Sequence, residues 1–177
     1  MNPEFTTRAV AALATTAALL MMLAEMLRSR ANERGLRARG AVEPATDVYR
    51  AMAWAYPLGF VSMGIEGAWF GPHPGATTLA GAAVFAGAKA LKFWAIAALG
   101  NRWTFRVLVL PSAPLVTSGP YAWLRHPNYV AVIGELAGFA LLVGAPVTGP
   151  VAVAGFGMLI WRRIAVEEQA LGRSRSA

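Results

Sequence analysis

The chain has 177 residues, of which 56% are hydrophobic and 14% are charged, and its mean hydropathy is +0.48. A soluble domain carries about 25% charged residues, so this composition excludes an ordinary soluble domain and indicates a single domain embedded in a membrane. The net charge is +7, and the basic residues lie beside apolar segments. In that position, basic residues usually set the orientation of a membrane protein and bind anionic lipid headgroups, so we do not expect nucleic-acid binding. Because the chain has no cysteine, disulfides, thiolate metal sites and cysteine nucleophiles are excluded, and we expect no metal.

Five apolar segments are expected to cross the membrane as helices, at residues 9–27, 51–70, 76–99, 128–143 and 147–164. The first is long enough for a hydrocarbon core of ~30 Å at 1.5 Å per residue. It is longer than the apolar region of a cleavable signal peptide, and its basic cluster follows it, so we expect no such peptide. The predicted fold class is therefore all-α, a multi-pass membrane protein with about five transmembrane helices.

Polar segments connect these predicted helices. Residues 28–50 form a charged block, expected to be a short interfacial helix followed by a turn near Gly40 and Pro44. Residues 71–75 and 144–146 have the composition of tight turns. The turn at 144–146 makes the fourth and fifth segments antiparallel neighbours.

The longest region without a predicted helix is 100–127, which contains Pro111, Pro114 and Pro120 and cannot form one continuous helix. A loop of this length usually has a function. Small residues dominate the first half of the segment that precedes it, 76–99, and favour close packing against another helix.

The arginine distribution predicts the topology. With five crossings, the 28–50 block, the 100–127 loop and the C-terminal tail lie on one side and hold nearly every arginine, whereas the turns at 71–75 and 144–146 hold none. The positive-inside rule places the arginine-rich side and the C-terminus in the cytoplasm and the N-terminus outside.

Two polar clusters flank the last two apolar segments. They consist of Arg125, His126, Asn128 and Tyr129 at the start of the fourth, and Arg162, Arg163, Glu167 and Glu168 at the end of the fifth. Because a tight turn joins these segments, we expect the clusters to face each other and form a cytoplasmic pocket under the 100–127 loop. The alternatives are a solvated helix end with i,i+4 ion pairs, and an ordinary loop histidine at His126.

Charged residues also lie within the apolar segments. Glu135 is about seven residues into its segment, ~10 Å deep at 1.5 Å per residue, and Lys92 is at a similar depth. An ion pair between Lys92 and Glu135 would lower the cost of burying both charges. The alternative is that Lys89 and Lys92 extend their side chains to the interface.

The sequence resembles the isoprenylcysteine carboxyl methyltransferase family, especially its short bacterial members. The similarity lies in residues 119–121, residues 125–129 and the Arg-x3-Glu-Glu of 163–168, and it extends to 32–43 and 99–116. Sterol reductases and phospholipid methyltransferases of membranes carry stretches like 125–129. The terminal Arg-x3-Glu-Glu makes the resemblance more specific.

This resemblance implies an integral membrane O-methyltransferase that uses S-adenosylmethionine, similar to protein-S-isoprenylcysteine O-methyltransferases. Residues 101–177 would bind the cofactor and catalyse the reaction, and residues 1–100 would form a three-helix membrane region. Arg163 and Glu167 would be catalytic, with Arg163 orienting the acceptor oxygen and Glu167 holding the polar end of the cofactor. The candidate cofactor-binding residues are Tyr121, Arg125, His126, Pro127, Asn128, Tyr129, Glu135, Glu167 and Glu168. The candidate substrate-side residues are Trp103, Arg106 and Lys92.

The expected partners are the lipid bilayer and a lipophilic acceptor that enters the site from it. The chain has no segment expected to recognise the C-terminal tail of a protein substrate, so the acceptor can be a small molecule. Candidates are a prenylated cysteine-like carboxylate, a small lipophilic acid and a phenolic lipid. Alternatives are an NADPH-dependent membrane reductase of the sterol reductase type, a phospholipid methyltransferase and a non-catalytic scaffold. The expected location is the bacterial inner membrane.

Overall fold

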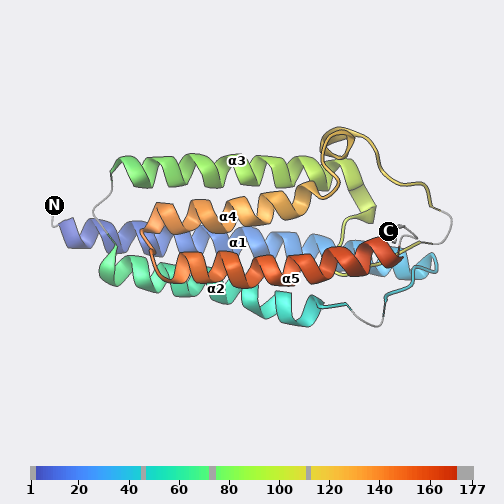
Figure 1. The fold of residues 1–177 in the computed structure, drawn as a ribbon, viewed down its shortest axis with the longest axis horizontal. Coiled ribbons are helices and arrows are strands. Elements are labelled where there is room, and N and C mark those ends of the chain that lie inside the picture. Colours follow the sequence, from blue (N-terminus) through green and yellow to red (C-terminus); the bar gives the residue numbers. More distant parts are fainter. Residues whose placement is uncertain (1–2, 45–46, 72–74, 111–112, 171–177) are drawn as a thin grey trace.

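The computed structural model describes residues 3–44, 47–71, 75–110 and 113–170, and these form an elongated helical bundle (Figure 1). No strand occurs among them; Val42 and Val109 form an isolated antiparallel bridge. The elements are α1 (Pro3–Ala38), α2 (Tyr49–Phe70), α3 (Ala76–Leu99), the short 3-10 helices η1 (Gly100–Arg102) and η2 (Gly119–Ala122), α4 (Pro127–Val143) and α5 (Thr148–Ala170). The predicted all-α fold class is confirmed.

Three helical stretches are long and apolar enough to cross a membrane, namely Phe5–Ala38, Ala76–Arg102 and Thr148–Ala170. The protein is therefore an integral membrane protein. The apolar helix α4 is shorter, with 17 residues, and α2, which carries Arg50 and Glu66, is not among the three. That all five helices cross the bilayer stays a prediction.

The first charged block differs from its prediction, because it contains no separate interfacial helix. Helix α1 continues through residues 28–38 and ends at Ala38. The chain then turns at Gly40, which has a φ of +83° that glycine adopts without strain. The first part of the block therefore extends the first apolar segment as one helix of 36 residues. Of the predicted turn at 71–75, residues 72–74 lie outside the described residues.

Small residues bring α3 and α4 into close contact, as the sequence predicted for the first half of α3. A Cβ atom built on Gly81 would lie 2.3 Å from the backbone nitrogen of Leu142, and one on Gly138 would lie 2.5 Å from that of Phe85. Next to this contact, the rings of Phe60 and Phe139 pack with centroids 4.7 Å apart in the core. This packing fixes α4, and with it the residues at the start of α4.

One end of the bundle collects the connections that matter for function. The segment from α1 to α2, the loop from α3 to α4 and the end of α5 all lie there, while the start of α1 lies at the opposite end (Figure 1). The two polar clusters and the long loop therefore share one end of the molecule, as the predicted arrangement requires.

Candidate functional site

The start of α4 and the end of α5 meet through a hydrogen-bonded trio. The Tyr129 hydroxyl donates to the Glu167 carboxylate, and the Arg163 guanidinium donates through Nε to the Tyr129 oxygen over 2.9 Å. Arg163 is also 3.6 Å from Glu167 in an i,i+4 pair. The predicted meeting of the two polar clusters is confirmed.

His126 lies between two carboxylates next to this trio. Its Nδ1 is 3.6 Å from Glu167 and its Nε2 is 3.6 Å from Glu168, and its ring stacks on Tyr129. The Glu167 carboxylate, assisted by Glu168, raises the pKa of His126 in spite of partial burial. Burial and the charge of Glu167 likewise raise the pKa of Tyr121. Glu167 therefore gives this part of the site its negative potential.

Arg163 is buried and held from three sides. Besides Tyr129, its guanidinium pairs with Asp47 over 3.1 Å and donates to the carbonyl oxygen of Phe105. The sequence did not indicate that Asp47 or the Phe105 carbonyl would contact Arg163. Asp47 is one acidic residue within a charged block, and a backbone carbonyl belongs to no sequence motif. The first third of the chain thus helps to orient an arginine near its end.

The segment 103–109 runs across the site and is anchored by helix α1 and the turn after it. The Ser29 hydroxyl accepts from the backbone N–H of Phe105 over 2.8 Å, and the Asn32 amide donates to the Trp103 carbonyl over 2.7 Å. The Val42–Val109 bridge holds its far end with two hydrogen bonds of 2.9 Å. We call the segment 103–109 the strap.

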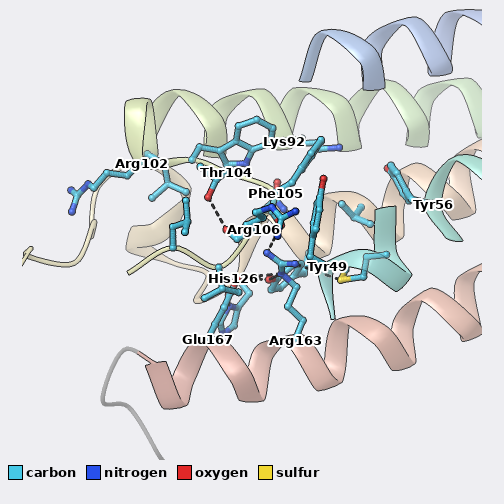
Figure 2. Close-up of a pocket in the computed structure, with 18 of the residues that line it drawn as sticks. Tyr49, Tyr56, Lys92, Arg102, Thr104, Phe105, Arg106, His126, Arg163 and Glu167 are labelled. Atoms are coloured by element: carbon cyan, nitrogen blue, oxygen red, sulfur yellow. Dashed lines mark hydrogen bonds and ion pairs between the residues drawn. The ribbon is translucent and has the colours of Figure 1, made fainter. Parts of the chain in front are cut away.

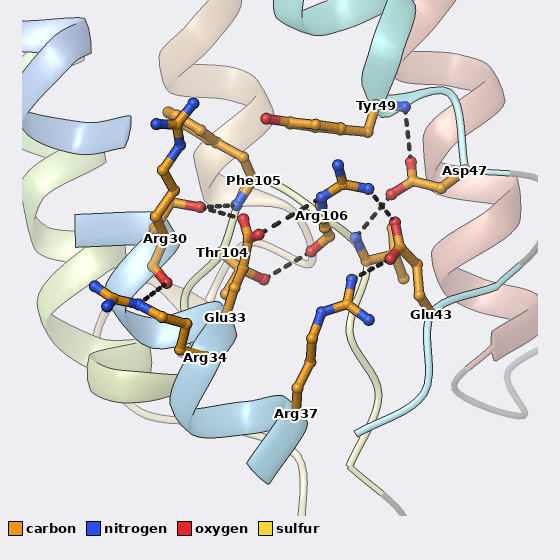
Figure 3. A network of polar contacts seen from close by, with 12 residues as sticks. Arg30, Glu33, Arg34, Arg37, Glu43, Asp47, Tyr49, Thr104, Phe105 and Arg106 are labelled. Atoms are coloured by element: carbon orange, nitrogen blue, oxygen red, sulfur yellow. Dashed lines mark hydrogen bonds and ion pairs between the residues drawn. The ribbon is translucent and has the colours of Figure 1, made fainter. Parts of the chain in front are cut away.

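Arg106 on the strap belongs to a polar network with the first charged block (Figure 3). It lies 2.6 Å from Glu43 and 3.5 Å from Glu33, over the Tyr49 ring, and Arg37 also pairs with Glu43. Burial would raise the pKa of Glu43, but its hydrogen bonds with Arg106 and Arg37 lower it overall. The geometry gives Arg106 an anchoring role; its predicted contact with the substrate stays a prediction.

One cavity of about 710 Å³ connects the polar trio with an apolar chamber between the helices (Figure 2). Met22 and Met26 of α1, Met52 of α2 and Phe156 of α5 contribute to its apolar wall. The predicted site residues that line it are Trp103, Arg106, Tyr121, Arg125, His126, Asn128, Tyr129, Arg163, Glu167 and Lys92.

Three predicted cofactor residues do not line the cavity. Pro127 is buried as the first residue of α4, and Glu168 lies behind His126 and 3.8 Å from Arg125. Glu135 is fully buried, and it pairs with Lys89 and Lys92. The pairing of Lys92 with Glu135 is thus confirmed, at 3.4 Å, whereas a direct contact of Glu135 with a cofactor has no geometric support.

The side-chain oxygen of Asn128 is a buried polar atom at the polar end of the cavity. Among the described residues, Asn128 Oδ1 has no hydrogen-bond partner, and His126 Nε2 has only the ion-pair contact with Glu168 at 3.6 Å. Buried polar groups in native proteins are generally paired, so unpaired ones beside a cavity indicate a ligand or water. The described residues contain no group of three histidine, aspartate or glutamate side chains suited to a metal ion.

The sequence model of the isoprenylcysteine carboxyl methyltransferase family matches residues 79–173, which is more than half of the chain. This chain belongs to the isoprenylcysteine carboxyl methyltransferase family. The matched region runs from α3 through the strap and α4 into α5, so it contains the residues that close the polar end of the cavity.

Two bacterial relatives of this methyltransferase-family chain match over most of their length. The uncharacterized protein YpbQ of Bacillus subtilis (strain 168) is 33% identical over 153 residues, which cover 86% of this chain and 91% of YpbQ. An uncharacterized protein of Haemophilus influenzae is 28% identical over 141 residues, which cover 79% of this chain and 82% of that protein. No solved structure matches the chain.

Proposed function

We propose that this protein transfers a methyl group from S-adenosylmethionine to an oxygen of a lipophilic acceptor. The observation that carries the proposal is one continuous cavity, which has a polar end at His126 and Glu167, an arginine beside that end, and an apolar chamber deeper in the bundle. A water-soluble donor and a lipophilic acceptor need such a two-part site. Family membership supports the methyl-transfer chemistry.

The polar end has groups that suit the donor. Glu167 offers a carboxylate for its positively charged portion or its ribose hydroxyls, and Asn128 Oδ1, which has no hydrogen bond among the described residues, offers a further acceptor. The aromatic rings of Tyr121 and Tyr129 line the same end and suit contact with an adenine or a sulfonium. When bound there, the donor would supply an electrophilic methyl group.

The arginine suits the acceptor. Arg163 is buried, and a buried guanidinium attracts and orients a carboxylate or phenolate oxygen. Methyl transfer from a sulfonium is an in-line displacement, so the protein contributes chiefly by placing the nucleophile and the methyl group correctly. A carboxylate needs no base for this step, whereas a phenol must lose its proton before or during it. The acceptor itself can be a prenylated cysteine-like carboxylate, a lipophilic acid or a phenolic lipid.

The proposed location is the bacterial inner membrane, with the arginine-rich end of the bundle in the cytoplasm, where S-adenosylmethionine is made. The positive-inside rule supports this orientation. Both relatives are bacterial proteins.

Binding of S-adenosylmethionine to the purified protein tests the cofactor. We predict that Glu167→Gln weakens this binding about tenfold or more, because it removes the negative charge that faces the donor while keeping the size of the side chain. Isothermal titration calorimetry measures the dissociation constant, and methyl transfer into a bacterial lipid extract then identifies the acceptor.

The matched control is Glu66→Gln, because Glu66 binds the start of α5 at the other end of the bundle through Val147 and Thr148. This variant should bind S-adenosylmethionine as the wild type does. Wild-type affinity of Glu167→Gln would contradict the role of that carboxylate. Binding of NADPH in place of S-adenosylmethionine would overturn the proposal in favour of a reductase.

A further inference from the structure

We propose that the deep end of the cavity is a second polar subsite, where Tyr56 and Lys92 bind an uncharged hydroxyl or carbonyl group of the acceptor. The inference rests on the proposed function and narrows it: the acceptor carries a second oxygen-bearing group along its apolar body, apart from the oxygen that receives the methyl group.

The subsite belongs to a buried ion cluster of Glu25, Lys89, Lys92 and Glu135. Lys89 lies 2.9 Å from Glu25 and 3.0 Å from Glu135, and Lys92 lies 2.7 Å from Glu25 and 3.4 Å from Glu135. All four side chains are almost completely buried, within helices α1, α3 and α4. Charges inside a membrane bundle are costly, and a functional role is the first hypothesis for them.

Only part of this cluster faces the cavity. Lys92 lines the wall, together with Tyr56 of α2, whose hydroxyl donates to Glu135. Figure 2 draws Tyr56 and Lys92 on one side of the cavity and His126, Glu167 and Arg163 on the other. If the cluster served only to join helices, apolar side chains could cover it completely. Instead, Tyr56 and part of the otherwise buried Lys92 side chain lie at the wall of the chamber.

Both groups retain hydrogen-bonding capacity. An ammonium group has three donors, and the carboxylate partners of Lys92 among the described residues are Glu25 and Glu135. A tyrosine hydroxyl that donates its proton can still accept through its oxygen. A hydroxyl group fits both, since it accepts from Lys92 and donates to Tyr56, whereas a carbonyl group uses Lys92 alone.

The charge balance of the cluster selects an uncharged group. Two lysines and two glutamates sum to zero, so an added carboxylate or amine would bring an uncompensated charge into a buried site. The neutral oxygen is therefore expected at the deep subsite, and the acidic end lies at Arg163 as in the proposed function, where a five-donor guanidinium keeps donors beyond its contacts with the protein. This assignment orients the molecule in the cavity.

The spacing of the two ends follows from α4. Glu135, which accepts from Tyr56, comes six residues after Tyr129, which contacts Arg163, and this corresponds to roughly 9 Å along the helix at 1.5 Å per residue. Val132 and Phe156 add apolar surface to the wall of the same cavity. The second oxygen is thus expected near the middle of a long apolar chain, several bonds from the acidic group.

Three fatty acids test the subsite by binding to the purified protein loaded with S-adenosylhomocysteine. They are hexadecanoic acid, its derivative hydroxylated at the eighth carbon, and the isomer hydroxylated at the chain end. We predict that the mid-chain hydroxyl tightens binding about three- to tenfold over the other two, the effect of one or two added hydrogen bonds. Tyr56→Phe should reduce this preference, because only the hydrogen bond from Lys92 remains, while Tyr49→Phe, which changes a tyrosine at the strap end of the same cavity, should leave it unchanged.

The outcomes separate the two proposals. Equal affinity for the three acids, a preference of unchanged size in Tyr56→Phe, or no binding of any of them would overturn the subsite. If S-adenosylmethionine still binds and Glu167→Gln still weakens it, the methyltransferase proposal stands without the subsite. Loss of S-adenosylmethionine binding in the wild type would instead refute the proposed function.

Discussion

Arg163 is the residue at which three parts of the chain meet. Its guanidinium contacts Tyr129 on α4, Asp47 before α2 and the Phe105 carbonyl on the strap. A planar guanidinium reaches the three partners from three different nitrogens, whereas a lysine would offer its three donors from one nitrogen. Asp47 further accepts from the Val107 N–H over 2.9 Å, so one carboxylate positions both the arginine and the strap. The orientation of Arg163 therefore depends on residues far from it in sequence.

The charge state of His126 gives a prediction at the same scale. Its ordinary pKa is about 6.5, and Glu167 and Glu168 raise that pKa in the folded protein. Because the folded-state pKa exceeds the unfolded one, the protonated ring stabilises the fold fully below about pH 6.5, and this stabilisation is lost as the pH rises through the folded-state pKa. The melting temperature of the wild type should thus exceed that of His126→Gln most strongly at low pH.

Thermal unfolding in detergent from about pH 5.5 to about pH 9 measures this difference. The gap between the two proteins should shrink with rising pH. A gap that stays constant, or grows, across this range would show that the ion pairs of His126 do not contribute to stability.

Among the helices, the contact of α3 with α4 is decisive, because it carries the start of α4 to its place above the cavity. Close approach requires the missing side chains of Gly81 and Gly138. The strap is the second element that matters, and Ser29 and Asn32 of α1 hold it through backbone hydrogen bonds. Helix α1, which the family match does not include, is therefore part of the site's framework.

A single methyl group tests the α3–α4 contact. In Gly138→Ala the new Cβ would lie 2.5 Å from the backbone nitrogen of Phe85, so one helix must shift. We expect a loss of about 1–3 kcal/mol in the free energy of unfolding, as for other overpacked sites. Gly155→Ala on α5 is the matched control, because its Cβ meets no atom within 4 Å. Equal stability of the two variants would argue against close packing at Gly138.

At the scale of the whole molecule, the bundle separates its charges along its length. The arginine-rich segment after residue 28, the strap and the end of α5 share one end, and the turn between α4 and α5 lies at the other (Figure 1). This distribution agrees with an orientation set by the positive-inside rule. The polar end of the cavity would then open toward the cytoplasm, and its apolar chamber would lie at bilayer depth.

Because the chain has no cysteine, single cysteines can report this orientation. In spheroplasts of a bacterial host, a membrane-impermeant maleimide should label Val147→Cys, in the turn before α5. Arg34→Cys, at the opposite end of the bundle, should be labelled only after the membrane is permeabilised. Both side chains are exposed in the structure, so burial in the protein does not limit the reaction. The reverse pattern would invert the topology.

Much of this arrangement could be predicted from local features of the sequence. Hydropathy indicated the helices. The short turn at 144–146 makes α4 and α5 antiparallel neighbours, and this local connection is enough to bring His126 near Glu167. The depths of Lys92 and Glu135 within their segments predicted an ion pair, since a buried charge needs a partner.

Tertiary structure alone decided the remaining partners. It brought Glu25 of α1 to Lys89 and Lys92, and it placed Asp47 against Arg163, which is 116 residues away. Such contacts join helices that no short turn connects, and their distances depend on how side chains of several helices pack at once. The sequence by itself therefore determined which residues lie at each depth and at each end of the bundle, whereas only packing determined which of those residues face one another across the cavity.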